Sequence, residues 1–362
     1  MADVGHSDRE AAVLDRIAAF RRRRPVLKDE VVTLAHGAGG KASAALVGEV
    51  FVDAFTADPG PLPDAATLPL ESGERLAFST DSFVVKPWRF PGGSIGHLAV
   101  HGTVNDLAVQ GAVPRWLSAA FVIEEGFPVS ELRAIASDMA DAAAVAGVAI
   151  VTGDTKVVGR GAADGVFITT AGVGIIPPGR ELDPGRVRPD DVVLVSGTIA
   201  DHGMAVMLAR GDLALEADIR SDTAPLGGLV AVLIDAAPST RWLRDPTRGG
   251  VGTVCNELAH DSGLGVALDE SALPINPAVV GACDLLGIDP LYVANEGKLV
   301  AVVDPSESDA ALAAMRAHPQ GKAAARIGEI VGDPARIVVL RTTFGGTRIV
   351  DMLVGDPLPR IC

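Results

Sequence analysis

The sequence predicts an α/β (α+β) protein with two mixed-sheet domains and a flexible C-terminal tail. Its 362 residues are 48% hydrophobic, which is enough for more than one buried core. Short apolar runs typical of strands alternate with stretches of helical period along most of the chain. A stretch rich in Pro and Gly at 175–191 is typical of a domain linker.

These patterns predict four parts of the chain. They are a variable N-terminal extension (1–30), an N-terminal domain (31–178), a C-terminal α/β domain (179–340) and a C-terminal segment with the tail (341–362). The extension has the pattern of a short amphipathic helix that ends at Arg21–Arg24. Its early acidic residues, and the lack of an apolar block after its arginines, argue against a signal peptide.

The N-terminal domain contains three strand-like runs and two helical patterns. The strands are expected at 75–81, 117–125 and 148–154. One helix should begin at a capping Ser94 and stop at Gly111, and the other should end at Gly147.

The C-terminal domain begins with a buried strand, a tight turn and a helix at 192–210, and a similar turn and helix follow at 244–263. Strands and helices alternate to about residue 340. From about 341 the sequence predicts irregular structure, ending in a tail stiffened by Pro357 and Pro359.

Composition excludes several classes of protein. The net charge of −15 argues against a nucleic-acid surface, which needs stripes of Lys and Arg. No apolar run reaches the roughly eighteen residues of a membrane span. The cysteines Cys255, Cys283 and Cys362 fit neither a disulfide framework nor a zinc spacing, which favours a reducing, cytoplasmic location. Cys255 and Cys283 fall in apolar helical patterns and should be buried.

Three aspartates interrupt otherwise apolar sequence, namely Asp81, Asp106 and Asp154. Any one of them could be a hydrogen-bonded cap or turn, but three in one domain favour a shared cation. Carboxylates with no His or Cys nearby suit Mg²⁺, which often bridges protein carboxylates and phosphate oxygens. The sequence therefore predicts a nucleotide ligand.

Two glycine-rich turns fit a phosphate group. The stretch HGAGGKAS at 36–43 precedes a helical pattern, and DPTRGGVG at 245–252 places Arg248 and two glycines at a helix start. The first stretch is not a P-loop, because the Gly-Lys-Ser/Thr ending is missing. Either turn alone is weak evidence, since glycine before a helix is commonly just a turn.

Glu296 of NEGK and Lys156 of GDTK are candidates for proton transfer or charge stabilisation near a nucleotide. For NEGK, which sets Glu296 near Lys298, a surface ion pair is the simpler interpretation. Cys362 is the last residue, and an exposed terminal thiol oxidises unless something uses it.

Together the stretches HGAGG, FSTDS, GTVNDLAVQGA, IVTGDTKVV, DPTRGGV, ANEGKLV and the terminal PRIC resemble the HypE family of hydrogenase maturation proteins, which are carbamoyl dehydratases. The resemblance covers roughly 31–362. The wider motifs are shared with a superfamily that includes aminoimidazole ribonucleotide synthetase and selenophosphate synthetase. PRIC is what distinguishes this family.

The resemblance implies two domains of the aminoimidazole ribonucleotide synthetase-like type and a homodimer formed through the N-terminal-domain sheets. It implies ATP and Mg²⁺ as cofactors, and dehydration of a carbamoyl group on the C-terminal cysteine to a thiocyanate. It also implies a carbamoyltransferase partner of the HypF type and an iron-carrying acceptor complex of the HypC-HypD type. The cyano group would go to the iron of a [NiFe] hydrogenase.

Carried onto this sequence, the resemblance makes Cys362 the carbamoyl acceptor, and it places Glu296 and Lys156 at positions linked to deprotonation. Asp81, Asp106 and Asp154 are implied as metal carboxylates. The implied nucleotide-binding positions are Gly37, Gly39, Gly40, Asp81, Asn105, Asp106, Asp154, Thr155, Asp245, Arg248, Gly249 and Gly250.

Two other functions remain open from the sequence. An ATP-dependent small-molecule synthetase or kinase with this fold would turn over a free metabolite and would not need Cys362. A non-catalytic carrier whose tail is gated by nucleotide would bind ATP without coupled phosphate release.

Overall fold

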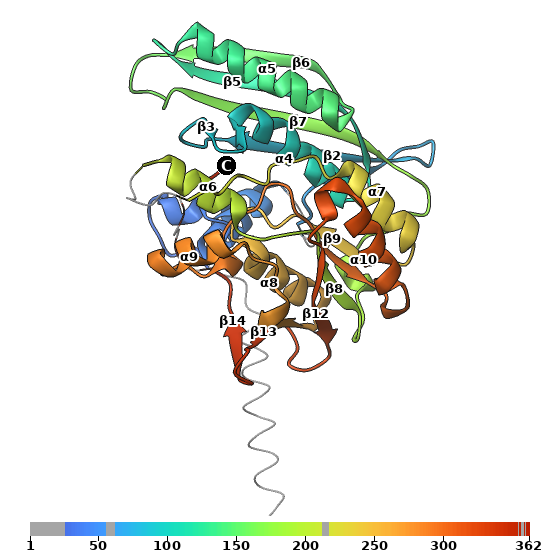
Figure 1. Cartoon of the computed structure of the whole chain (residues 1–362). Helices are drawn as coiled ribbons and strands as arrows, with labels where there is room; N and C mark the ends of the chain where they lie inside the picture. The colour runs from blue at the N-terminus through green and yellow to red at the C-terminus, as the bar shows by residue number, and fades with distance from the viewer. Residues whose placement is uncertain (1–25, 56–61, 212–216, 354, 356–357, 359) are drawn as a thin grey trace, which may run out of the picture.

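Two mixed β-sheets and the helices packed on them form the protein, in a computed structural model that describes residues 26–55, 62–211, 217–353, 355, 358 and 360–362 (Figure 1). The predicted α/β class with mixed-sheet domains is confirmed. The expected N-terminal helix ending at Arg21–Arg24 lies outside the described residues, as do Pro357 and Pro359.

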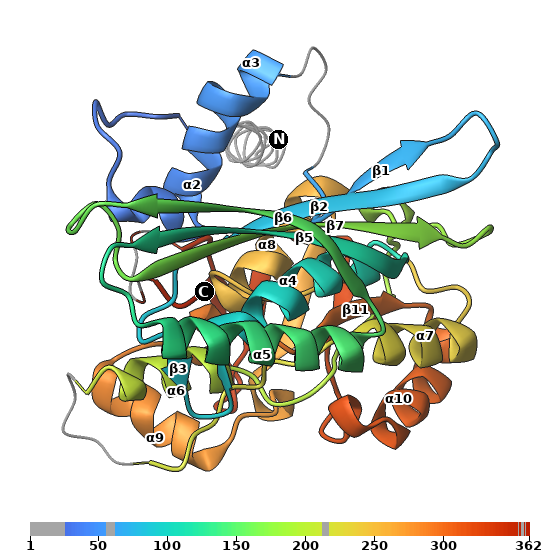
Figure 2. The same ribbon diagram turned by 90° about the horizontal axis from the view of Figure 1, so that it is seen from above.

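The first sheet has the strand order β1-β2-β7-β5-β6, and only the β5–β6 pair is parallel. The strands span Ala66–Pro69 (β1), Arg75–Phe83 (β2), Val113–Glu124 (β5), Ala149–Val158 (β6) and Val166–Ile176 (β7). β2 contains the predicted run 75–81, and β5 and β6 overlap the runs 117–125 and 148–154 to within one residue. Helices α4 (Ile95–Val109) and α5 (Val129–Ala146) cover one face of this sheet (Figure 2).

The ends of α4 and α5 follow the predicted signals, with one difference. Gly111 and Gly147 adopt left-handed conformations (φ 83° and 70°) just beyond the two helices. Ser94 is the N-cap residue of α4, but its hydroxyl makes no capping hydrogen bond. It donates instead to Asp138 Oδ2 of α5, at 2.6 Å, and so ties the two helices together.

The second sheet has the order β14-β13-β10-β12-β8-β11-β9. Its strands span Val192–Val195 (β8), Trp242–Arg244 (β9), Gly265–Asp269 (β10), Val300–Val303 (β11), Ala325–Val331 (β12), Val338–Arg341 (β13) and Thr347–Val350 (β14). Helices α7 (Gly227–Ala236) and α10 (Ser308–Ala317) share one apolar cluster with this sheet, and α8 (Gly250–Ser262) belongs to the other.

The expectation of irregular structure from residue 341 is wrong. β13 and β14 pair as an antiparallel hairpin, with Val338 opposite Val350. The strand was missed because its sequence, TRIV, has little apolar alternation and follows a glycine pair.

The two domains meet through α6 (Asp201–Ala209) and α9 (Pro277–Leu286), which share an apolar cluster with α4, α5 and the first sheet. The short strands β3 (Arg89–Phe90) and β4 (Gly93–Ser94) lie beside them, and the short helices α2 (Lys41–Leu46) and α3 (Asp53–Phe55) precede the first sheet. The chain ends between α6 and the first sheet, and Leu358 and Ile361 are buried in this same cluster (Figures 1 and 2).

Within the described residues, none of the helices combines the length and apolar character that crossing a bilayer requires. Cys255 and Cys283 are both buried, as predicted.

Candidate active site

A cavity of about 260 Å³ lies where the two domains meet. Seven of the residues predicted for the site line it, namely Gly39, Asp81, Asp106, Asp245, Arg248, Glu296 and Cys362. They come from distant parts of the chain, so the fold brings together the motifs that the sequence singled out.

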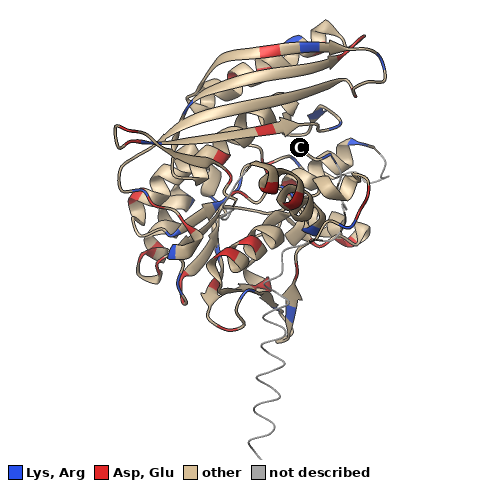
Figure 3. Ribbon diagram, turned by 180° about the vertical axis from the view of Figure 1, so that it is seen from behind, with Lys and Arg blue, Asp and Glu red and all other residues tan. Residues whose placement is uncertain are grey.

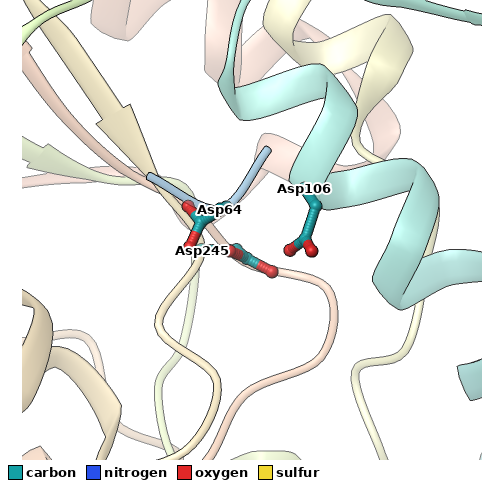
Figure 4. A group of neighbouring side chains, drawn as sticks. All are labelled: Asp64, Asp106 and Asp245. Atoms are coloured by element: carbon teal, nitrogen blue, oxygen red, sulfur yellow. The ribbon is translucent and has the colours of Figure 1, made fainter. Parts of the chain in front are cut away.

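Three carboxylates converge at one side of this cavity. Asp64, Asp106 and Asp245 each offer an oxygen atom, and these atoms lie within 4.8 Å of one another (Figure 4). Asp64 precedes β1, Asp106 is on α4, and Asp245 follows β9 of the other domain. Asp81 of β2 lies at the edge of this group, close enough for its charge to raise the pKa of Asp106.

Burial raises the pKa of all four carboxyl groups, and repulsion by neighbouring acids adds to the rise for Asp64, Asp106 and Asp245. Burial raises the pKa of Asp106 well above its ordinary value, and the charges of Asp81, Asp245 and Asp64 add to it. Burial, together with neighbouring acids, raises the pKa of Asp245 to about 7. Asp245 Oδ1 is buried without a hydrogen-bond partner among the described residues. Oxygen ligands that repel one another and leave one oxygen unsatisfied fit a hard cation such as Mg²⁺.

Hydrogen bonds and ion pairs fix two of the three acids. Ser79 of β2 donates to Asp106 Oδ2 at 2.5 Å. The guanidinium of Arg244 lies 2.8 Å from Asp64 Oδ1 and 3.2 Å from Glu257 Oε2. The orientation of Asp64 and Asp106 is therefore set by the protein itself.

The two predicted glycine-rich turns lie against each other beside the cavity. Arg248 donates a hydrogen bond from Nη1 to the carbonyl oxygen of Gly37, at 2.9 Å. Gly39 (φ +79°) packs so closely on Arg248 that a Cβ there would lie 2.9 Å from the Arg248 carbonyl oxygen. Gly40 is the N-cap residue of α2, and a Cβ there would lie 2.2 Å from the carbonyl oxygen of Leu353 in the C-terminal segment.

The turn at 245–252 requires its two glycines. Gly249 and Gly250 both have left-handed φ values, and a Cβ on Gly250 would meet the carbonyl oxygens of Leu291 and Val293 at 2.5 and 2.6 Å. This close approach starts α8 at Gly250 and points Arg248 at the cavity.

Glu296 is buried in the cavity wall, with 3% of its surface exposed. Burial raises its pKa well above the ordinary value, and the charges of Asp245, Asp222 and Asp81 act in the same direction. Its main-chain N–H donates to Asp222 Oδ1 at 3.1 Å, and Asp222 pairs with Lys298 at 3.1 Å.

Asn105 of α4 supports this segment. Its side-chain amide donates to the carbonyl oxygens of Ala224 and Glu296, and its Oδ1 accepts from the N–H of Leu226. The resemblance assigned Asn105 to the nucleotide. In the structure its donors and acceptor are directed at the backbone of the other domain.

The thiol of Cys362 lines the same cavity as Glu296. The residue is partly buried, and its carbonyl oxygen accepts a hydrogen bond from Val84 N–H at 3.0 Å. Burial, with the charge of Glu296 added, raises the pKa of the thiol to about 12. Cys362 is thus not a frayed terminus in this structure, because its main chain is anchored.

Asp154, Thr155 and Lys156 lie away from the cavity, on the edge strand β6. Lys156 Nζ is 2.7 Å from Asp154 Oδ2, and both side chains are mostly exposed. A single chain therefore does not assemble the predicted set Asp81, Asp106 and Asp154. The strand order places β6 three strands from β2, which separates Asp154 from Asp81 by about 14 Å at the usual strand spacing.

Asp64 was not predicted from the sequence. The predicted acids interrupt apolar runs, whereas Asp64 lies in the turn-rich stretch PLPDAA before the first strand. An Asp between a Pro-containing turn and a strand is a common turn residue, so the pattern carried no specific signal.

Comparison with known proteins places these features in a family. The model for the AIR synthase related protein N-terminal domain matches residues 63–176, and the model for the corresponding C-terminal domain matches 188–341. A carbamoyl dehydratase HypE of Rhodobacter capsulatus is 59% identical over 340 residues, covering 93% of this chain and 99% of that protein.

Two solved structures are similar over most of the chain. A HypE-HypF complex matches with a TM-score of 0.80 at 48% identity, covering 85% of this chain and 100% of that chain. A hydrogenase maturation protein HypE in complex with ATP matches with a TM-score of 0.77 at 44% identity, covering 92% and 100% of the two chains.

Proposed function

The chain belongs to the HypE family of carbamoyl dehydratases, and from this premise we propose that it dehydrates a carbamoyl group carried on its own Cys362. The product is a thiocyanate, and the role is the maturation of a [NiFe] hydrogenase. The observation that carries the assignment to Cys362 is that the terminal thiol lines the same cavity as Glu296 and the acidic cluster.

The residues around the thiol suit the chemistry of dehydration. The carboxamide must lose its oxygen and the protons of its nitrogen, leaving a carbon–nitrogen triple bond. ATP, when bound, supplies the phosphoryl group that makes the carboxamide oxygen a good leaving group. Glu296 accepts a nitrogen proton, since its raised pKa gives its carboxylate a higher proton affinity.

The acidic cluster and the glycine-rich turns have separate tasks in this proposal. Asp64, Asp106 and Asp245 hold Mg²⁺, with Asp81 beside them. Arg248, which lines the same cavity, would face phosphate oxygens. This set of metal ligands differs from the one that the resemblance implied. Asp64 lies in the acidic cluster, whereas Asp154 of the same chain lies away from it.

We further propose a homodimer formed through the first sheets of two copies. The face of this sheet opposite α4 and α5 exposes Phe78, Trp116 and Val122. Its strands carry few charged residues (Figure 3). An exposed apolar sheet face of this kind favours association with another protein surface.

The dimer would give Lys156 a role. By strand pairing, Lys156 lies on the same face as Val122, and Asp154 on the same face as Ala120. On that face Thr80 and Ser82 of β2 line the cavity. A second sheet packed on this face brings the Lys156 ammonium of one copy near the cavity of the other, where it can hold Glu296 ionised or stabilise the departing phosphate.

Partners follow from the same chemistry. A carbamoyltransferase of the HypF type would load Cys362, consistent with the similarity to the HypE-HypF complex. An iron-carrying HypC-HypD type complex would accept the cyano group. A reducing compartment such as the cytoplasm suits a mechanism that begins and ends with a free thiol.

The proposal is tested with the purified chain, a HypF-type carbamoyltransferase, carbamoyl phosphate, ATP and Mg²⁺. Mass spectrometry of the C-terminal peptide should show a carbamoyl adduct on Cys362 that loses one water mass after ATP is added. Cys362→Ser should show neither species. An adduct on Cys255 or Cys283, or an adduct that persists with ATP and Mg²⁺, would rule the proposal out.

A further inference from the structure

Hydrogen-bond donors from both domains hold the main chain of the last three residues. Nε2 of the buried His202 on α6 lies 3.1 Å from the carbonyl oxygen of Ile361. A carbonyl only accepts hydrogen bonds, so this nitrogen carries the proton and donates it. Val84, which follows β2, donates its N–H to the carbonyl oxygen of Cys362. Such contacts hold the backbone whatever side chains the tail carries.

Burial of apolar side chains also holds the tail in place. Leu358 and Ile361 have 8% and 3% of their surface exposed and belong to the apolar cluster that joins the two domains. Arg210, also from the α6 side, donates from Nη2 to the carbonyl oxygen of Arg360 at 2.7 Å. The tail is thus seated between the domains and does not simply lie on the surface.

The side chain of Arg360 makes contacts of its own, separate from those of the main chain. Its Nε donates to the carbonyl oxygen of Val84 at 3.1 Å, and its Nη1 forms an ion pair with Asp164. The guanidinium also lies over the ring of Phe167, 6.0 Å from its centre. Lys86 holds the other oxygen of Asp164, at 2.7 Å. The backbone of Arg360 is in the left-handed region (φ 56°), which is unfavourable for Arg and needs such support.

We propose that Arg360 and Asp164 are positioning residues for the dehydration step, and that their ion pair is a latch that holds Cys362 in the cavity and opens to release the tail to the carbamoyl donor. The inference rests on the proposed function of Cys362. Arg360 moves with the tail, whereas Asp164 stays in the loop before β7.

The character of the contact suits a latch. The two side chains are about one third exposed, 32% for Arg360 and 37% for Asp164. Exposed ion pairs contribute little to stability, so this one can open repeatedly at small cost. Hydrogen bonds from Arg360 and then from Lys86 hold the pKa of Asp164 below its ordinary value, so the carboxylate is charged at neutral pH.

Alkylation of Cys362 by iodoacetamide measures how often the latch is open. Cys255 and Cys283 are buried and should not react in the folded protein. The seated thiol has a pKa of about 12 and reacts slowly, whereas a released thiol with an ordinary pKa reacts readily. Asp164→Asn in the full-length chain should therefore raise the rate of Cys362 alkylation about three- to tenfold.

Single-turnover conversion provides the second readout. In Asp164→Asn the carbamoyl adduct should form at the wild-type rate or faster, because the donor needs the released tail, while its conversion to thiocyanate should slow about three- to tenfold. Asp164→Glu keeps the charge and should stay close to wild type in both measurements. Asp269→Asn removes a carboxylate of similar exposure that pairs with Arg341 far from the tail, and should change neither rate.

The outcomes separate this inference from the function on which it rests. Wild-type alkylation and conversion rates in Asp164→Asn would overturn the latch. Slower adduct formation together with unchanged alkylation would also overturn it, since that pattern indicates a contact with the donor. If wild-type protein forms the adduct but never converts it, the proposed function fails, while the alkylation rates still decide whether the latch exists.

Discussion

Asn105 on α4 of the first domain donates a hydrogen bond to the main-chain carbonyl oxygen of Glu296 in the second, at 3.3 Å. Oδ1 of the same side chain accepts a hydrogen bond from the N–H of Leu226 at 2.8 Å. The candidate base is therefore held by the domain that carries Asp106, one residue further along the same helix. This contact couples the distance between base and acidic cluster to the packing of the two domains.

Asn105→Ala should slow thiocyanate formation while leaving carbamoylation of Cys362 unchanged. It leaves buried polar groups unpaired, which costs roughly 1–3 kcal/mol of unfolding free energy. Asn256→Ala is the matched control, because the Asn256 amide also bridges two backbone carbonyls but lies at α8 and β14. The control should lose stability and keep its conversion rate. Equal conversion rates in the two variants would show that Asn105 does not position the base.

Glu296→Gln should stall the reaction after carbamoylation. The substitution keeps the shape of the side chain and removes its ability to take a proton, so conversion should fall by about two to four orders of magnitude. ATP binding and adduct formation should persist. Single-turnover mass spectrometry of the C-terminal peptide measures the step. Conversion at the wild-type rate would mean that another group is the base.

Asp106→Asn and Asp245→Asn should each weaken Mg²⁺-dependent ATP binding tenfold or more. Each change also removes repulsion among buried carboxylates, so the metal-free protein should be as stable as wild type or more stable. Calorimetric titration with Mg²⁺ and ATP measures binding, and thermal unfolding in EDTA measures stability. Asp269→Asn, an exposed and distant acid, is the control. Unchanged binding in both variants would remove the cluster from the metal site.

The sequence predicted the elements well and their relative positions less well. Apolar periodicity and glycine stops located α4 and α5 because these signals are local. The grouping of Asp81 with Asp154 failed within one chain because it depends on strand order, which is non-local. Asp81 is on β2, and Asp154 is on β6 at the far edge of the sheet.

Only part of the acidic cluster was predicted from the sequence, again because its assembly depends on non-local contacts. Asp106 and Asp245 lie in recognisable motifs, but their proximity results from docking of the two domains. Asp64 lies in a turn that resembles many others. The anchoring of Cys362 could not be predicted either. His202 contacts the carbonyl oxygen of Ile361 and Val84 donates to the main-chain oxygen of Cys362, so both contacts are distant in sequence and involve only the backbone of the tail.

Trp116→Arg should separate the proposed homodimer into monomers. Trp116 is 48% exposed on the free face of the first sheet, and a charge there opposes burial against a second sheet. Light scattering after size-exclusion chromatography measures the mass. The monomer should still accept the carbamoyl group but should convert it slowly, as should Lys156→Ala in the dimer. A wild-type protein that is monomeric at micromolar concentration would exclude this arrangement.

The pKa of Asp245 predicts how the stability of the metal-free protein depends on pH. The pKa is about 7 in the folded protein and about 3.8 when unfolded, so the folded state holds a proton that the unfolded state has lost between these values. The stabilisation is therefore complete below about pH 4 and is lost as the pH rises through 7.

Wild-type protein in EDTA should lose about 2 kcal/mol more unfolding free energy between pH 5 and pH 7 than Asp245→Asn. Mg²⁺ should abolish most of this difference, because a bound cation stabilises the ionised carboxylate. Urea unfolding at the two pH values measures this loss of unfolding free energy for each of the two proteins, once in EDTA and once with Mg²⁺. If both proteins lose the same free energy in EDTA, Asp245 is ionised at pH 5 and the acidic cluster does not repel as its geometry implies.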